Sequence, residues 1–181
     1  MKENRKNVEV LEVEDDQKSI LRQLLELYEY DFSEYNDQDV NEHGYYGYKY
    51  LDHYWTDANR YPFFIMVENK YAGFVLVNSH NYLLDDDQGR SIAEFFIMRK
   101  YRRKGVGSEA AKQIFDKYRG WWEVRQHGGN EPSKLFWRRV IDEYTAGQFT
   151  QMDVSTEKWV GQGIIFNNSR MRKAQILHDP V

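Results

Sequence analysis

Strand-like segments and helical stripes alternate along the first half of the chain. Residues 8–13 read VEVLEV, a nearly alternating pattern that is typical of a short strand. After Asp15 and Asp16, apolar residues at positions 20, 21, 24, 25 and 28 recur at helical spacing and predict an amphipathic helix. The apolar runs 62–67 and 71–77 flank the polar turn 68–70, so we expect a β-hairpin there.

The second half continues the alternation. It predicts strands at 92–98 and 122–126, a helix at about 108–118 and a second helix that begins at Pro132. Two more strands are expected at 148–154 and 159–166. Between residues 31 and 61 the pattern dissolves, and we expect short helices and loops there. The order predicts an α+β fold, and the absence of repeats or a Pro/Gly-rich linker predicts one domain over residues 1–181.

Composition narrows the functional class. The 181 residues include no cysteine, which excludes disulfides, zinc–thiolate sites and a cysteine nucleophile. No apolar run approaches the roughly 20 residues that a membrane span needs, and residues 1–10 show no apolar signal region, so we expect a cytoplasmic protein without a membrane partner. A pI of about 5.8 argues against a general nucleic-acid binder.

A basic segment stands out in this chain of net charge -4. Five of the six residues before Gly105 are Lys or Arg, and the predicted strand precedes them. Gly105 and Gly107 let backbone N–H groups approach an anion closely, and the N-terminus of the following helix adds positive charge. A phosphate or pyrophosphate is the ligand that this combination favours. The alternative is an ordinary solvated charged turn.

Known phosphate-binding motifs fit this segment unequally. Residues 105–110 formally match the dinucleotide-binding pattern G-x-G-x-x-A. In that fold, however, the glycines follow their strand almost immediately, whereas here a six-residue charged loop intervenes. The nucleotide-binding sequence G-x-x-x-x-G-K-[ST] is absent from the chain.

The segment Arg102-Arg103-Lys104-Gly105-Val106-Gly107 resembles the Q/R-x-x-G-x-G/A motif of the GNAT family of N-acetyltransferases. The resemblance extends upstream to AEFFIM and downstream to WEVRQ, Asn130 and KLFWRRVI. It implies a GNAT fold, in which a mixed, mostly antiparallel sheet is flanked by helices. It also implies acetyl-CoA as co-substrate, no metal, direct transfer of acetyl to a primary amine of a small molecule or peptide, and a possible homodimer.

The same resemblance assigns residues to the cofactor. The backbone at Ile97 and Met98 matches the strand end that pairs with the pantetheine arm and polarises the thioester carbonyl. Main-chain N–H groups of the pyrophosphate loop do most of the phosphate binding, and Asn130 matches an asparagine near the cofactor arm. Trp137 would flank the cofactor as an aromatic packing residue. The expected loop residues are Arg102, Arg103, Lys104, Gly105, Val106, Gly107 and Ser108.

Trp137 is also a departure from the family pattern. Many relatives carry a tyrosine there that protonates the leaving thiolate, and an indole N–H does not serve as such an acid. The acid is then Tyr144, another tyrosine, or no residue at all. This substitution favours the alternative function, a non-catalytic domain that binds or senses acyl-CoA.

Glu94 is the candidate general base. By alternation it shares a strand face with Phe96 and Met98, and a carboxylate there suits removal of a proton from the acceptor ammonium, directly or through a water. The alternative is a glutamate without a role. The five histidines show no metal-ligand spacing, and Asp85–Asp87, although able to bind a cation, fit a solvated turn.

The acceptor is expected in the unpatterned segment. Nine of the 14 tyrosines lie between Tyr28 and Tyr61, and residues 23–48 contain no Lys or Arg. Aromatic faces and carboxylates suit a cationic acceptor. The alternative is an acidic solvated surface over a tyrosine-rich core. The acidic residues of this window are Glu26, Glu29, Asp31, Glu34, Asp37, Asp39 and Glu42.

Overall fold

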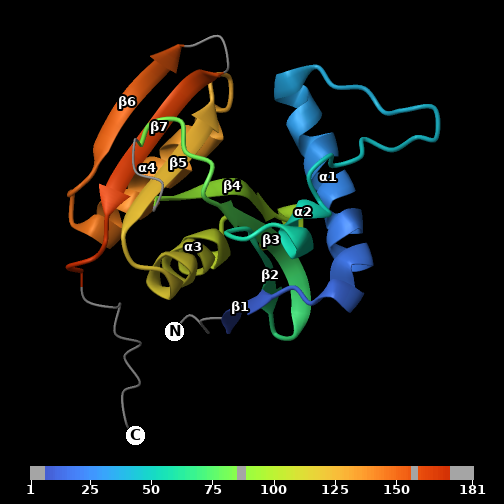
Figure 1. Ribbon diagram of the computed structural model, residues 1–181, viewed down its shortest axis with the longest axis horizontal. Coiled ribbons are helices and arrows are strands. Elements are labelled where there is room, and N and C mark those ends of the chain that lie inside the picture. The colour runs from blue at the N-terminus through green and yellow to red at the C-terminus, as the bar shows by residue number, and fades with distance from the viewer. Residues whose placement is uncertain (1–6, 85–88, 156–158, 172–181) are drawn as a thin grey trace, which may run out of the picture.

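A mixed sheet of seven strands forms the centre of the protein, in the order β1-β2-β3-β4-β5-β7-β6. The computed structural model, shown in Figure 1, describes residues 7–84, 89–155 and 159–171. Strands β1 (Val8–Glu12), β2 (Tyr61–Val67), β3 (Lys70–Asn78) and β4 (Arg90–Ile97) pair antiparallel. Strands β5 (Trp121–His127), β7 (Val160–Asn167) and β6 (Thr150–Ser155) form a second antiparallel group. The parallel pair β4–β5 joins the two groups.

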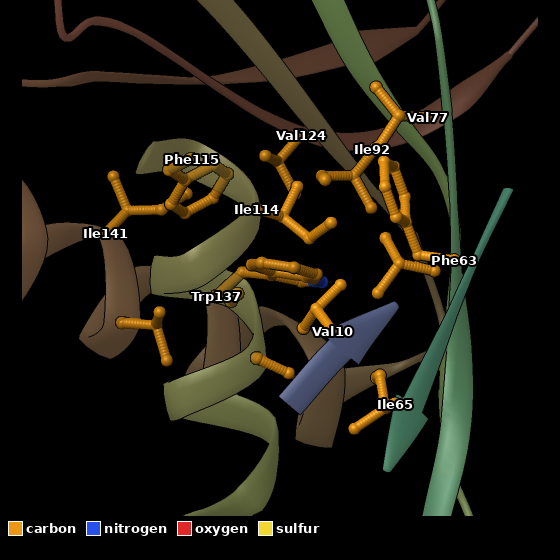
Figure 2. Close-up of a cluster of buried hydrophobic side chains, with 14 of the residues drawn as sticks. Val10, Phe63, Ile65, Val77, Ile92, Ile114, Phe115, Val124, Trp137 and Ile141 are labelled. Atoms are coloured by element: carbon orange, nitrogen blue, oxygen red, sulfur yellow. The ribbon is translucent and has the colours of Figure 1, made fainter. Parts of the chain in front are cut away.

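Helices cover both faces of the sheet. On one face, α3 (Val106–Lys117) and α4 (Glu131–Thr145) share a hydrophobic cluster with β1 to β5 and β7. Figure 2 shows part of this cluster, with Trp137 of α4 among side chains such as Val10 and Ile114. On the other face, α1 (Lys18–Asn36), which follows a 3₁₀ turn at Asp15–Gln17, packs with α2 (His53–Thr56) over β2 to β4. The mixed, helix-flanked fold predicted from the sequence is therefore confirmed.

The sequence dictates where α3 and α4 begin and pack. In α3, Ala110, Ala111, Ile114 and Phe115 are all fully buried, at the spacing that lines one helix face. Asn130 caps α4, because its side-chain oxygen accepts the Ser133 N–H at 3.0 Å, and a proline occupies the first turn. These two helices therefore hold their ends fixed against β4 and β5.

Two boundaries differ from the sequence-based expectation. The helical pattern dissolves from Asp31 in the sequence, yet α1 continues to Asn36. The additional turn places the ring of Phe32 against that of Tyr28, with ring centroids 5.6 Å apart. The end of the helix is thus held by aromatic contacts, whereas the helical pattern in the sequence was recognised mainly from its aliphatic residues. Helix α3 starts at Val106, two residues earlier than expected, because Gly105 itself forms its cap. The other helix and strand positions agree within about two residues.

Strands β4 and β5 separate partway along their length. Their pairing covers only Arg90 to Ile92 of β4, and the last pair is Ile92 with Val124. At the same point β4 carries a bulge, since Glu94 pairs with Leu76 and Ile92 with Val77, which leaves Ala93 without a partner on β3. The second half of β4 thus has one open edge inside the sheet.

Candidate active site

A cleft occupies the opening between the two strands. Its volume is about 430 Å³, and α1, β4, β5 and the first turns of α4 contribute its walls. Glu94 and Phe95 come from the part of β4 that does not pair with β5, Asn130 and Trp137 from α4, and Tyr28 from α1. The cleft thus brings together residues that lie far apart in the sequence.

The basic segment ends in a glycine-capped helix start with free backbone N–H groups. After the 3₁₀ turn Arg99–Tyr101, the chain reaches Gly105, whose φ of 76° lies in the left-handed region. The first helical hydrogen bond of α3 runs from the Glu109 N–H to the Gly105 carbonyl, at 3.0 Å. The N–H groups of residues 106–108 precede that bond and have no intrahelical acceptor, so they are available to an anion.

The basic side chains of this segment are only partly available. Arg99 and Arg102 both pair with Asp31 of α1, the former at 2.7 Å. Burial of Asp31 opposes ionisation, but the hydrogen bonds from Arg102 and Arg99 outweigh it and lower the pKa of this carboxyl. Lys104 donates to the Lys100 carbonyl at 2.8 Å, and Arg103 is exposed. The backbone N–H groups at the start of α3 are therefore more available to an anion than the side chains of Arg99, Arg102 and Lys104 are.

The open edge of β4 presents particular backbone groups. The Met98 N–H donates to the Ala72 carbonyl of β3 at 2.8 Å, so it is already satisfied. Because backbone groups alternate along a strand, those of Phe95 and Ile97 face the opening instead. The Ile97 carbonyl accepts a hydrogen bond from Arg102 Nε at 2.6 Å. Of the two residues expected to contact the pantetheine arm, Ile97 is thus the one with main-chain groups on the open side.

Glu94 lies at the cleft with two phenols bound to its carboxylate. Tyr28 donates one hydrogen bond to it, and Tyr48 donates another at 3.1 Å. Burial raises the pKa of Glu94 above its ordinary value, while the two hydrogen bonds and the charge of Arg125 limit the rise. As expected from alternation, it faces the α1 side together with Phe96.

Glu29 is a second carboxylate of the cleft that the sequence alone did not single out. It is 8% exposed. Burial, and then the charges of Glu94 and Glu26, raise its pKa from 4.5 to about 7. Helical periodicity predicts the face of α1 on which a residue lies. It does not predict which acidic side chain of that helix lies near the Glu94 carboxylate of β4.

Asn130 and Trp137 both line the cleft while serving the fold. The Asn130 side-chain oxygen is used as the cap of α4, which leaves its amide nitrogen for other contacts. Trp137 is 4% exposed and packs edge-on against Phe95, with ring centroids 4.8 Å apart. Its indole therefore forms the wall where the cleft meets the hydrophobic core.

Tyr144, one candidate for the general acid, points elsewhere. Its hydroxyl donates to Asp116 at 2.9 Å and accepts from Asn168 at 3.2 Å, and it does not line the cleft. Burial raises its pKa to about 12, which weakens it further as an acid. Tyr28 is the tyrosine that reaches the cleft, and its hydroxyl is bound to Glu94.

The acidic window divides into separate environments. Glu29 alone among its seven acidic residues lines the cleft, Asp31 binds the arginines, and Glu26 accepts the N–H groups of Tyr46 and Gly47 at 2.8 and 2.9 Å. The remaining four are exposed: Glu34, Asp37, Asp39 and Glu42. The window is therefore mostly a solvated surface, with one carboxylate directed to the cleft.

The histidines and acidic side chains form no metal centre in the part of the chain that the structure describes. There, no group of three or more His, Asp or Glu side chains is arranged to hold a metal ion. His127 lines the cleft, and its ring packs against Phe32 and Tyr35. Asp85–Asp87, a candidate cation site in the sequence, lie outside the described residues.

None of the described helices is long and apolar enough to cross a membrane.

Comparison with known families decides the relationship that this geometry suggests. The sequence model of the acetyltransferase (GNAT) family matches residues 21–141, which is more than half of the chain and includes α1 from Leu21 onward, the split strands and the basic segment. The chain belongs to this family. The resemblance inferred from the basic segment is thereby confirmed, and a GNAT acyltransferase is the class to which its site belongs. No curated protein matches the sequence at a significant level.

Solved GNAT structures share the fold over nearly their whole length. An acetyltransferase from Thermus thermophilus is 13% identical, with a TM-score of 0.63 over 89% of this chain and 97% of that one. AAC(6')-Ib in complex with ribostamycin and coenzyme A is also 13% identical, with a TM-score of 0.64 over 93% and 99%. The PaiA N-acetyltransferase from Thermoplasma acidophilum, in complex with coenzyme A, is 11% identical, with a TM-score of 0.60 over 89% and 99%. At these identities the comparison establishes the fold.

Proposed function

We propose that this protein transfers an acetyl group directly from acetyl-CoA to a primary amine of a small molecule or peptide, and that the amine is cationic. The observation that carries the proposal is the split between β4 and β5, which opens beside a glycine-capped helix N-terminus and has the carboxylate of Glu94 at its cleft. The pyrophosphate of an acyl donor suits the helix N-terminus, and its thioester carbonyl suits the open edge of β4. Coenzyme A in the related structures supports this donor.

The site residues fit such a donor. The N–H groups at the start of α3, including those of Val106, Gly107 and Ser108, suit the pyrophosphate, and the exposed Arg103 adds charge. A backbone N–H of the open β4 edge, at Ile97, suits the thioester carbonyl, where negative charge develops during acyl transfer. Met98 follows directly on the strand, and Asn130 and Trp137 line the far wall of the cleft.

Glu94 prepares the acceptor. An ammonium has no lone pair, so an amine of pKa near 10 loses a proton before it attacks at neutral pH. We assign that proton to the Glu94 carboxylate, directly or through one water. The nitrogen lone pair then forms the new bond to the acetyl carbon, the carbon–sulfur bond breaks, and coenzyme A leaves as a thiolate. The thiolate takes up the second proton that the nitrogen loses, so the products are a neutral amide and a thiol. A thiolate is a tolerable leaving group, so the reaction proceeds without a tyrosine at position 137.

A second candidate function is binding of acyl-CoA without catalysis. The observation that favours it is Trp137, which fills the place of the usual acidic tyrosine and packs into the core. Such a protein would hold the acyl-CoA at the same loop and release no thiol.

Time-resolved thiol release from acetyl-CoA, measured across a panel of primary amines, separates the two functions. Release that depends on the amine, with an equal amount of acetylated amine by mass spectrometry, is the expected result. Binding of acetyl-CoA without release for any amine would support the non-catalytic alternative and contradict the proposal.

A further inference from the structure

Glu29 differs from its acidic neighbours on α1 in having no partner. The carboxylate of Glu26 accepts two backbone N–H groups, and that of Asp31 binds two arginines of the phosphate loop. Glu29 is more than nine-tenths buried and lines the cleft, yet within residues 7–84, 89–155 and 159–171 it has neither a hydrogen bond nor an ion pair. Its carboxylate is therefore directed at a space that a ligand enters.

The charges around Glu29 make this arrangement unfavourable without a ligand. Burial first, and then the nearby carboxylates of Glu94 and Glu26, raise the pKa of Glu29 to about 7. The cation of the cleft, Arg125, is already compensated, because it lies 3.0 Å from the fully buried carboxylate of Glu123. It also stacks on Tyr82, at 4.0 Å from the ring centroid. A buried charge normally has a partner of opposite sign, and this one lacks it.

A cationic ligand would supply the missing partner. Glu94, on β4, stands beside the open strand edge where the reacting amine belongs, whereas Glu29 enters from α1 on another wall of the same cleft. Aromatic side chains between the walls, among them Tyr28 and Phe32, suit an aliphatic stem. The cleft thus offers two carboxylates and apolar surface to one small molecule.

We propose that Glu29 binds a second positive group of the acceptor, so that the preferred substrate carries at least two amines separated by an apolar stem. One amine, beside Glu94, receives the acetyl group, and the other remains charged against Glu29. The inference rests on the proposed acetyltransferase function and specifies the acceptor class for it. A monoamine would occupy only the position beside Glu94.

Matched amines test this directly. Linear α,ω-diamines, from ethylenediamine to hexamethylenediamine, are compared with n-alkylamines of equal length as acceptors for the wild type, Glu29→Gln and Glu34→Gln. Glu34 is exposed on the same helix and does not line the cleft, so its variant controls for loss of one negative charge. Glu29→Gln keeps the side-chain shape and removes an unpaired buried charge, so it should unfold thermally at the wild-type temperature or higher.

The expected result is that the best diamine exceeds its matched monoamine in kcat/KM by at least about tenfold, the effect of one charged contact. Glu29→Gln should remove this preference, mainly through KM, and Glu34→Gln should keep it. Calorimetry with coenzyme A present gives a second readout. Because burial and the neighbouring carboxylates raise the pKa of Glu29 to about 7, its ionisation on binding a diamine at neutral pH should release protons, and the variant should release fewer.

Two results would overturn the inference: no diamine preference in the wild type, or a preference that survives Glu29→Gln, including the case in which both amine classes lose activity equally. Acetylation of monoamines by the wild type in the same assay would leave the acetyltransferase function standing. If no amine releases thiol, the proposed function itself fails and the inference fails with it.

Discussion

Glu94 and Glu29 differ in what surrounds them, and this difference decides their proposed roles. Two phenol hydroxyls donate to Glu94, which stabilises its ionised form, while Glu29 has no such donors among the described residues. Alternation along the strand predicted the face on which Glu94 lies. The partners Tyr28 and Tyr48 come from 66 and 46 residues away, so no local pattern shows them.

Glu94→Gln should lower turnover about a hundredfold or more at neutral pH, the usual size of a general-base effect. The base acts only when ionised, and burial raises its pKa, so the wild-type rate should fall as pH decreases through that raised pKa. In the variant the inflection at the Glu94 pKa should be absent and the rate should follow the fraction of free amine, so the deficit should shrink at high pH. The measurement is kcat/KM against pH on the best amine, with acetyl-CoA affinity as the control. A wild-type profile in the variant would place the base elsewhere.

At the scale of elements, the loop between β4 and α3 was the part that the sequence predicted most completely. Its glycines and the helix that follows are local features, and both were found where the sequence put them, apart from the two-residue shift in the helix start. The ion pairs of Arg99 and Arg102 with Asp31 span 68 and 71 residues and depend on the packing of α1. They link the basic segment to α1, a helix that lines the cleft, which no pattern within the basic segment indicates.

Gly105→Val should weaken acetyl-CoA binding by at least about tenfold, because valine at a φ of 76° forces the loop to reposition its N–H groups. Gly44→Val is the matched control: Gly44 has a φ of 78° and, like Gly105, has open space where a Cβ would lie, but it is outside the loop. Isothermal titration calorimetry of both variants with acetyl-CoA measures the difference. Equal affinities in the two variants would show that this loop does not bind acetyl-CoA.

At the scale of the whole molecule, the split sheet is the feature that makes one site from separate elements. The order of strands and helices was predictable because each carries its own periodicity. The split was not, since it depends on where β5 leaves β4 and on the bulge at Ala93. Resemblance to the family supplied the site residues that we propose, whereas the burial of Glu29 at the cleft depends on the packing of α1 over the sheet.

The central claim is that acetyl-CoA binds along the open edge of β4 with its pyrophosphate at the start of α3. Amide NMR of the isotopically labelled protein, titrated with acetyl-CoA, tests it most directly. The amide resonances of Gly105, Val106, Gly107, Ser108 and Ile97 should shift together and saturate at one equivalent, while those of β1 and β6 stay in place. Saturable shifts confined to other elements, with the loop and Ile97 unchanged, would contradict it.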